Sequence, residues 1–281
     1  MKKARWSLYF LMLFSIAVVL SYFSIFTVSK TAQLNINQDS SQDHSLQCFE
    51  NPKAEFIDSN GQLDILVWNI YKQSQAGWKE TLELYTKNAN LALLQEVSMD
   101  EHFISYTKNS HWFSSHVDAF SVFGLSTGVL TLSTSSPLLA CAHIEFEPWL
   151  QLPKSGIYAT FHLSDGRELV VVNLHSVNFT YGVQEYEKQI KELIVALKKH
   201  KGPIIFAGDL NAWSLERIAT IEKTIAQLGL KEVRFEPDNR KQFINGLALD
   251  YVFYRGLKLI DSKSPITDAS DHNPLLVKFK L

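Results

Sequence analysis

The sequence predicts a layered α/β or α+β domain, and three observations lead to that fold class. Of the 281 residues, 46% are hydrophobic, which is enough to bury a sizeable core in one large domain or, less favourably, in two small ones. After Gly61, short apolar runs of strand length alternate with segments of helical periodicity. Internal repeats and low-complexity tracts are absent from the sequence, which argues against solenoids and coiled coils.

Each element is predicted from its local pattern. Apolar runs that predict strands occur at residues 63–67, 91–94, 129–132, 144–146, 157–161, 169–173, 204–207, 249–254, 257–260 and 275–279. Helical periodicity is found at residues 78–87, 99–108, 183–201 and 214–228. The third helix is amphipathic, and Gly202-Pro203 ends it. Many strands with interspersed helices fit two packed sheets covered by helices.

The N-terminal segment has its own character. Residues 6–28 carry no charge, and as a helix they are long enough to span the roughly 30 Å core of a bilayer. Lys2, Lys3 and Arg5 should stay in the cytoplasm, so the rest of the chain would be exported. A cleaved signal peptide is the alternative, but the apolar stretch exceeds the ~7–15 residues of a signal core. We predict residues 1–30 as a transmembrane anchor or signal sequence. The uncleaved anchor is favoured over the cleaved signal peptide, and the protein would then be a single-pass protein of the cell membrane.

A polar segment separates this anchor from the folded part. Residues 31–58 are predicted as a flexible tether and residues 59–281 as the domain, which would be extracytoplasmic, or periplasmic in a Gram-negative cell. Cys48 and Cys141 are the only cysteines, which excludes a cysteine-based zinc site and allows one disulfide. Export favours that bridge, which would pin the tether to the domain; two unrelated buried thiols are the alternative.

The charge distribution bounds the partners. The formal net charge is −2, but Lys2, Lys3, Arg5 and Lys30 are the only charges in the first thirty residues. Without these four, 23 basic residues face 29 acidic ones, a net charge of −6 over residues 31–281. A general nucleic-acid binder usually shows a basic excess. A divalent cation could supply the missing positive charge locally.

Polar side chains capable of chemistry follow five of the apolar runs. They are Asn69, Gln95-Glu96, Asn173-Leu174-His175, Gly208-Asp209-Leu210-Asn211 and Asp271-His272. Alone, each of the last two motifs is equally well explained as a turn, because Asp-His before Pro and Gly-Asp-x-Asn both form turns. Five strand ends with the same arrangement favour a functional site, since a rigid sheet can present such groups to a ligand.

In this order the motifs resemble the endonuclease/exonuclease/phosphatase superfamily, which includes pancreatic deoxyribonuclease, abasic-site nucleases, sphingomyelinases and inositol polyphosphate phosphatases. The resemblance runs from Asp64 to Phe279, and His175 is similar to the deoxyribonuclease I-like branch. Tyr251 departs from the pattern, because many relatives carry His there; this puts substrate contacts near Asp250 in doubt. The resemblance implies a four-layer α/β/β/α sandwich of two mixed β-sheets flanked by helices, in a membrane-anchored bacterial-type member.

A metal site is predicted at two of the strand ends. Glu96 offers a hard oxygen ligand suited to Mg²⁺, with Mn²⁺ as the alternative ion, and Asn69 could help to place it. The resemblance places Asp271 near the metal. We expect a cation here because no Lys or Arg is evident near these residues to balance a phosphate. An ordinary surface carboxylate is the alternative reading of Glu96 alone.

Hydrolysis needs an aligned water and a group that takes its proton. His272 is the candidate general base, because imidazole titrates near neutral pH. The resemblance implies that Asp250 orients His272, that Asp209 and Asn211 orient the water and the phosphate, and that His175 donates to a phosphate oxygen or the leaving group.

Other candidates receive ordinary structural roles. The remaining seven histidines do not repeat the strand-end pattern, so a di-zinc hydrolase is not expected. Trp149 and Trp213 could stack on a substrate or face a membrane, but a buried packing role is favoured.

Together these observations predict a Mg²⁺-dependent phosphoesterase that hydrolyses phosphodiester bonds by general-base activation of water. Its substrate would be a nucleic acid (DNA or RNA) or a phospholipid head group. The deoxyribonuclease-like setting of His175 favours DNA, whereas the acidic domain and the tether favour lipid or small phosphoesters. The protein would be a monomer that contacts the membrane through residues 6–28. A catalytically inactive, membrane-tethered binding module is the rival hypothesis, although every predicted site position carries a competent residue.

Overall fold

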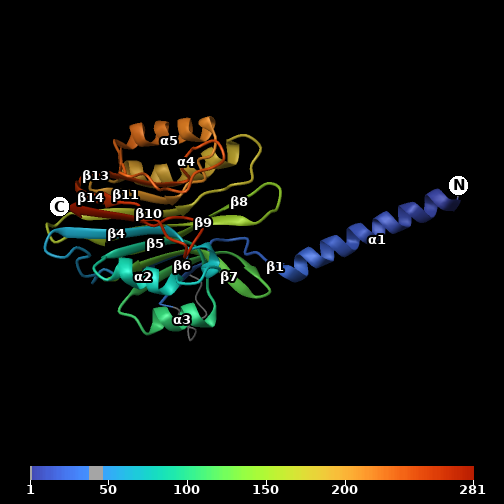
Figure 1. Cartoon of the computed structure of the whole chain (residues 1–281), viewed down its shortest axis with the longest axis horizontal. Helices are drawn as coiled ribbons and strands as arrows, with labels where there is room; N and C mark the ends of the chain where they lie inside the picture. Colours follow the sequence, from blue (N-terminus) through green and yellow to red (C-terminus); the bar gives the residue numbers. More distant parts are fainter. Residues whose placement is uncertain (1, 38–46) are drawn as a thin grey trace.

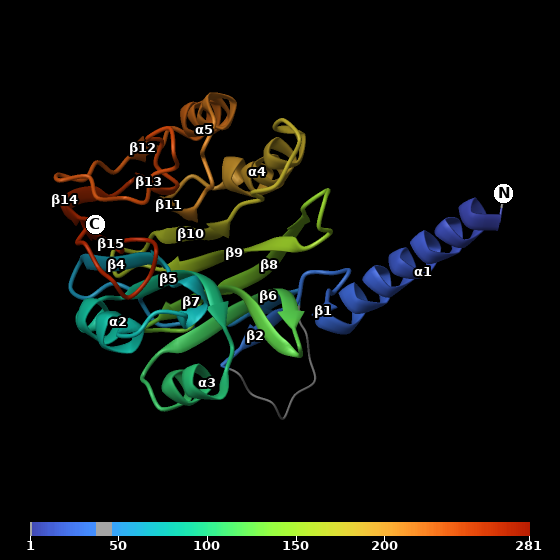
Figure 2. The same ribbon diagram turned by 45° about the vertical axis from the view of Figure 1, so that its right-hand side comes forward.

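The computed structural model describes residues 2–37 and 47–281. Helix α1 (Lys2–Ile25) projects from one end of a layered domain, as Figures 1 and 2 show. Part of the predicted tether, residues 38–46, lies outside the described residues, as do the side chains of Lys2, Lys3 and Arg5 on which the predicted orientation depends.

The first sheet is mixed and has eight strands within the described residues. Its spatial order is β1 (Phe26–Thr27), β6 (Phe113–Val122), β7 (Leu125–Ser133), β5 (Leu91–Ser98), β4 (Gln62–Asn69), β15 (Leu275–Lys280) and β14 (Lys258–Lys263). Strand β2 (Leu34–Ile36) also pairs with β6. Strands β4 and β5 are parallel, and β15 is antiparallel to β4.

The second sheet is also mixed, with seven strands in the same described part of the chain. Its order is β12 (Lys231–Glu232), β13 (Asp250–Arg255), β11 (Ile204–Asp209), β10 (Glu168–His175), β9 (Pro153–His162), β8 (Leu139–Phe146) and β3 (Cys48–Glu50). Strands β10 and β11 are parallel, and β13 is antiparallel to β11.

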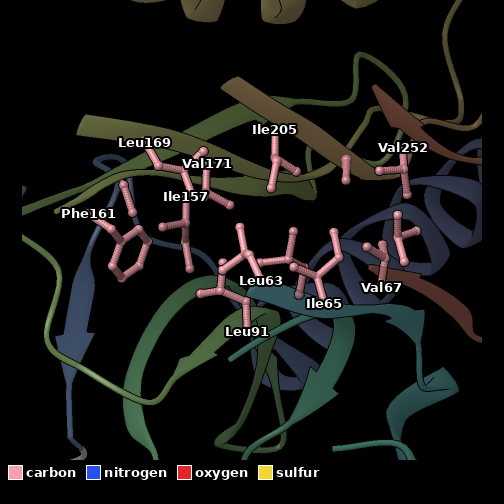
Figure 3. Close-up of a cluster of buried hydrophobic side chains, with 14 of the residues drawn as sticks. Leu63, Ile65, Val67, Leu91, Ile157, Phe161, Leu169, Val171, Ile205 and Val252 are labelled. Carbon is pink, nitrogen blue, oxygen red and sulfur yellow. The ribbon is translucent and has the colours of Figure 1, made fainter. Parts of the chain in front are cut away.

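The main core lies between the two sheets. Leu63, Ile65 and Val67 alternate along β4 and point into this space (Figure 3). The side chains that they meet come from the second sheet and include Ile157, Val171, Ile205 and Val252. A strand that is buried on both faces reads as a continuous apolar run, which is why β4 and β10 were readily predicted.

Helices cover the outer faces of both sheets. Helices α2 (Trp78–Thr86) and α3 (Glu101–Lys108) pack on the first sheet through Leu82 and Phe103. Helices α4 (Gln184–Lys199) and α5 (Leu215–Leu228) cover the second sheet, and Ser214 caps α5 by accepting from the Arg217 amide. The predicted four-layer α/β/β/α sandwich is confirmed (Figure 1).

The region between α1 and the domain differs from the predicted tether. Strands β2 and β3 form within residues 31–58, and Leu34 is buried in the main core. Cys48 pairs with Cys141 across β3 and β8, and the two form a disulfide. Apolar residues in a mostly polar stretch and one covalent bridge therefore attach this segment to both sheets.

The transmembrane helix predicted over residues 6–28 overlaps α1, which ends at Ile25, whereas Phe26–Thr27 form strand β1. In the described part of the chain, no helix combines the length and the apolarity that a membrane crossing requires.

A glycine next to the strand end of β11 is required by close packing. Gly208 has φ of 135°, and a Cβ atom there would lie 2.0 Å from the Leu174 carbonyl oxygen on β10. We expect Gly208→Ala to lower the free energy of unfolding by about 2–5 kcal/mol, through backbone strain and overpacking. Urea denaturation measures the loss. Gly166→Ala is the control, because φ there is 84° but nothing lies within 4 Å of the added Cβ. Equal losses at the two positions would contradict the close-packing argument.

Candidate active site

The predicted site residues come together at one edge of the two sheets. Parallel strands end at the same edge, so β4 and β5 bring Asn69 and Glu96 together, and β10 and β11 do the same for His175 and Asp209. Strands β13 and β15 run the other way, so they begin where their neighbours end. Asp250 therefore lies opposite Asp209, in register.

A buried histidine–aspartate pair forms one side of the site. His272 Nδ1 lies 2.7 Å from Asp250 Oδ2, and both side chains are almost completely buried. The backbone around His272 is held by two further bonds. Trp68 Nε1 donates to the His272 carbonyl at 2.9 Å, and Ser270 Oγ accepts from the His272 amide. The predicted dyad is therefore present in geometry.

The Asn69 amide joins the two sheets at the centre of the site. Its Nδ2 atom donates to Asp209 Oδ2 at 3.0 Å and lies 3.5 Å from Glu96 Oε1. Asp209 Oδ1 accepts from the Asn211 amide at 3.0 Å, while Asn211 Nδ2 donates to the Ser176 carbonyl. Asn211 has φ of 45°, a left-handed conformation that Asn tolerates better than most other non-glycine residues.

Two lysines that the sequence analysis missed complete the site. Glu96 lies at an irregularity of β5 with φ of 53°, and its carboxylate forms an ion pair with Lys72. Lys154 Nζ donates to His175 Nε2 at 3.1 Å. The expectation that no cation lies near these strand ends is thus wrong. Lys72 follows Asn69 closely in the sequence, but Lys154 is brought in only by the pairing of β9 with β10.

At neutral pH, one histidine of the site is neutral and the other is protonated. Burial, followed by the nearby Lys154 ammonium, lowers the pKa of His175 to about 4, so this ring is neutral. Burial also acts to lower the pKa of His272, but the Asp250 carboxylate and its hydrogen bond outweigh burial and raise the pKa to about 10. His272 is therefore an imidazolium that forms an ion pair with Asp250.

The carboxyl groups also differ. Burial alone would raise the pKa of Glu96, but the positive charges that surround it outweigh burial and hold the pKa well below its usual range; His175 contributes only when protonated, and Lys154 and Lys72 contribute throughout. Because His175 is neutral at neutral pH, the two lysines carry this effect. Burial raises the pKa of Asp209, against the opposing influence of His272 and His175. Asp209 is therefore a better proton acceptor than an ordinary aspartate.

The donor set around Glu96 fits a hard divalent cation. The Glu96 carboxylate is a hard oxygen ligand of the kind that Mg²⁺ prefers, and its ion pair with Lys72 shows that it attracts positive charge. The Asn69 amide faces Glu96 with Nδ2, because its Oδ1 accepts from the Tyr71 amide, so this side chain would have to turn to offer an oxygen ligand. Asp209, Asp250 and His272 also offer ligand atoms that lie within 4.8 Å of one another. The hydrogen bond between His272 and Asp250 occupies one donor atom of each, so we favour the Glu96 side.

Some predicted residues lie apart from this centre. Asp271 is exposed, with its carboxylate 3.4 Å from Lys241 Nζ, and its role as a metal ligand stays a prediction. Trp213 is half-buried and packs on Arg217 at 4.4 Å, as expected. Trp149 is 63% exposed, so the predicted buried packing role is wrong for this residue.

Comparisons with known proteins agree with this geometry. A sequence profile of the Endonuclease/Exonuclease/phosphatase family matches residues 66–272. The chain therefore belongs to this family, whose members are hydrolases of phosphoester bonds. The UPF0294 protein of Vibrio cholerae serotype O1 is 48% identical over 281 residues, covering 100% of this chain and 99% of that protein.

Solved structures show the same fold. An endonuclease/exonuclease/phosphatase family protein from Leptotrichia buccalis superimposes with a TM-score of 0.62 at 17% identity, covering 78% of this chain and 100% of that chain. ANGEL2, a 2',3'-cyclic phosphatase, gives a TM-score of 0.61 at 16% identity, covering 85% of this chain and 99% of that one. At these identities the likeness concerns the fold.

The raised pKa of His272 predicts a pH dependence of stability. Between pH 6.5, the usual pKa of a histidine, and about pH 10, His272 keeps its proton in the folded protein but loses it in the unfolded chain. The stabilisation is complete below pH 6.5 and is lost as the pH rises towards 10. The free energy of unfolding should fall by about 1.4 kcal/mol per pH unit in this range.

Asp250→Asn should flatten this pH dependence of the free energy of unfolding, as measured by urea denaturation with EDTA. Glu192→Gln, beside the remote His143, is the control and should leave it unchanged. Parallel pH profiles for Asp250→Asn and the unsubstituted protein would contradict the charge assignment.

Proposed function

We propose that the protein is a Mg²⁺-dependent phosphodiesterase that acts as a monomer outside the cytoplasm. The observation that carries this proposal is the bridge made by Asn69. It links a carboxylate suited to a cation, Glu96, to a buried proton acceptor, Asp209, which lies beside the His272–Asp250 pair. The Cys48–Cys141 disulfide supports an oxidising compartment. Anchoring through residues 6–28 stays a prediction.

The proposed reaction is hydrolysis of one P–O ester bond. A water oxygen bonds to phosphorus, the bond to the leaving oxygen breaks, and the water proton passes to an acceptor on the protein. His272 was predicted as that acceptor, but an imidazolium cannot accept a proton. Asp209 suits the task better, because it is buried, its pKa is raised, and Asn69 and the Asn211 amide orient it.

The remaining side chains would hold the phosphate. His272, kept protonated by Asp250, can donate from Nε2 to a phosphate oxygen. Lys154 places a positive charge beside the neutral His175, where the leaving oxygen gains charge. A Mg²⁺ ion held by Glu96, and by the Asn69 oxygen once that amide turns, would when bound neutralise charge on the same phosphate.

The rival hypothesis, a catalytically inactive binding module, does not account for the buried charged groups of the site. A protein that only binds a ligand has no need for a buried imidazolium–carboxylate pair, since burying ionised groups is costly. Four charged or titratable groups, Asp209, Asp250, His272 and His175, are nevertheless buried together and hydrogen-bonded. This arrangement supports catalysis.

Metal dependence is tested at Glu96. Glu96→Gln removes the ligand charge and leaves the His272–Asp250 pair intact. We expect it to raise the Mg²⁺ concentration needed for half-maximal hydrolysis of bis-p-nitrophenyl phosphate by at least ~10-fold. Glu192→Gln on α4 serves as the matched control and should not change the metal requirement. Full turnover in excess EDTA would refute the metal proposal.

The pairing of His272 with Asp250 is tested by a double-mutant cycle. His272→Ala removes the proposed donor to the phosphate and should lower kcat by at least ~10²-fold, and Asp250→Asn should do similar damage because it no longer keeps the ring protonated. If the two act as a unit, the double variant should be no worse than His272→Ala alone. Losses that simply add in free energy would mean that the two residues are independent.

A further inference from the structure

Three surface loops beside the site are free of charged residues and expose large apolar side chains. These site-flanking loops are residues 148–153, which follow Glu147 and end at the first residue of β9, residues 176–183, between β10 and α4, and residues 242–249, between Lys241 and β13. Their exposed apolar side chains are Trp149, Leu150, Phe179, Tyr181, Phe243 and Ile244. Large apolar side chains that are exposed close together on a protein surface mark an interaction site.

The first two loops are fixed to each other and to the site. Residues 176–183 directly follow the catalytic His175. The buried Glu147 carboxylate accepts from the amides of Asn178 at 2.7 Å and Phe179 at 3.3 Å, and so ties the start of the first loop to the second. The rings of Trp149 and Tyr181 lie 5.4 Å apart. Hydrogen bonds and ring contacts between the two loops therefore fix the positions of these exposed aromatic side chains.

Trp213 connects the third loop, residues 242–249, to the second loop, residues 176–183. This residue lies two positions after Asn211, and its Nε1 donates to Asn178 Oδ1 at 2.8 Å. Its ring contacts Phe243 at 5.9 Å, and its carbonyl accepts from Asn245 Nδ2 at 2.8 Å. All three loops thus border the catalytic residues.

The apolar surface of the loops continues into helix α1. Tyr22 Oη on α1 donates to the Leu150 carbonyl at 2.7 Å. Six consecutive residues of α1, Tyr9 to Phe14, are exposed and apolar or aromatic, so they cover the whole circumference of the helix. Figure 2 shows α1 leaving the domain on the side towards which the β8–β9 connection projects. A helix that is apolar all round needs an apolar environment.

We propose that the site-flanking loops contact the surface of a lipid bilayer and that the substrate is a phospholipid head group presented by it. This inference rests on the proposed function. Trp and Tyr, which have an apolar body and a polar edge, are favoured at membrane interfaces. Lys154 comes directly after the first loop and reaches His175, so one cation lies where a head-group phosphate would enter.

A nucleic acid fits these observations less well. Residues 31–281 carry a net charge of −6, and a polyanion needs many basic contacts along its length. The three loops contain no Lys or Arg, and the lysines that border them, Lys154 and Lys241, already contact His175 and Asp271. A lipid head group presents a single phosphodiester, for which local cations at the site are sufficient.

Loop insertion is tested with a fluorescent label, independently of activity. Both cysteines are held in the disulfide, so an introduced cysteine is the unique free thiol. Phe179→Cys and the control Ile260→Cys on β14 replace side chains of similar exposure, 57% and 55%. The full chain carries an NBD label at either position in vesicles of phosphatidylcholine and phosphatidylglycerol. We expect the label at 179 to be quenched by doxyl-labelled lipid and shielded from iodide. Equal iodide quenching at the two positions would overturn the proposal.

Substrate class is tested by turnover. The combined Trp149→Ser and Tyr181→Ser variant should lower the ratio of vesicle phospholipid hydrolysis to bis-p-nitrophenyl phosphate hydrolysis by at least ~10-fold. Ile260→Ser should leave this ratio unchanged.

The outcomes separate the two proposals. An unchanged ratio for the loop variant would overturn the lipid inference while leaving the phosphodiesterase intact. Single-stranded DNA turned over in preference to lipid, with the loop variant weakening DNA hydrolysis, would also overturn it. A label at 179 that enters lipid in a protein inactive on all phosphodiesters would refute the proposed function and the substrate, and would leave only the contact with the bilayer.

Discussion

The site depends on the face-to-face packing of the two sheets, because neither sheet carries a complete set of catalytic groups. The first sheet supplies Asn69 and Glu96, and the second supplies His175, Asp209 and Asp250. A buried polar contact fixes the sheets next to the site, where Gln95 Nε2 donates to Asn173 Oδ1 at 2.7 Å. Since an unpaired buried amide is costly, this contact specifies one relative position of the sheets. The Asn69–Asp209 hydrogen bond, 3.0 Å long, is a second polar contact between the same two sheets.

That packing also determines the charges. Within one buried centre, His175 faces Lys154 and is neutral, while His272 faces Asp250 and is protonated. The same side chain thus has two states. At His175, burial and the Lys154 charge outweigh Asp209 and Glu96, whereas at His272 the Asp250 carboxylate outweighs burial. Exposed pairs of this kind would be screened by water and salt. Burial makes the difference large enough to assign one histidine as a neutral hydrogen-bonding group and the other as a cation.

The sequence predicted most of this arrangement, and the failures have physical causes. Strand ends such as Glu96 and Asp209 were found because long apolar runs precede them. Lys154 was missed because its place beside His175 depends on the register of β9 against β10, which pattern does not reveal. Strand β6 was missed because Phe113–Val122 is rich in Ser, His and Asp, although it pairs with β7 along its length. The protonated state of His272 likewise depends on tertiary burial.

Charge is concentrated inside the site and absent from the site-flanking loops, residues 148–153, 176–183 and 242–249, and this contrast bears on substrate choice. Lys72 and Lys154 are engaged locally with Glu96 and His175, so they create little positive field beyond the site. An acidic surface repels an extended polyanion over about 8–10 Å at physiological salt. A single phosphodiester is affected mainly at short range, once it reaches the lysines. Apolar loops that hold the domain against a lipid surface would bring such a group within that range, so binding would not depend on long-range attraction.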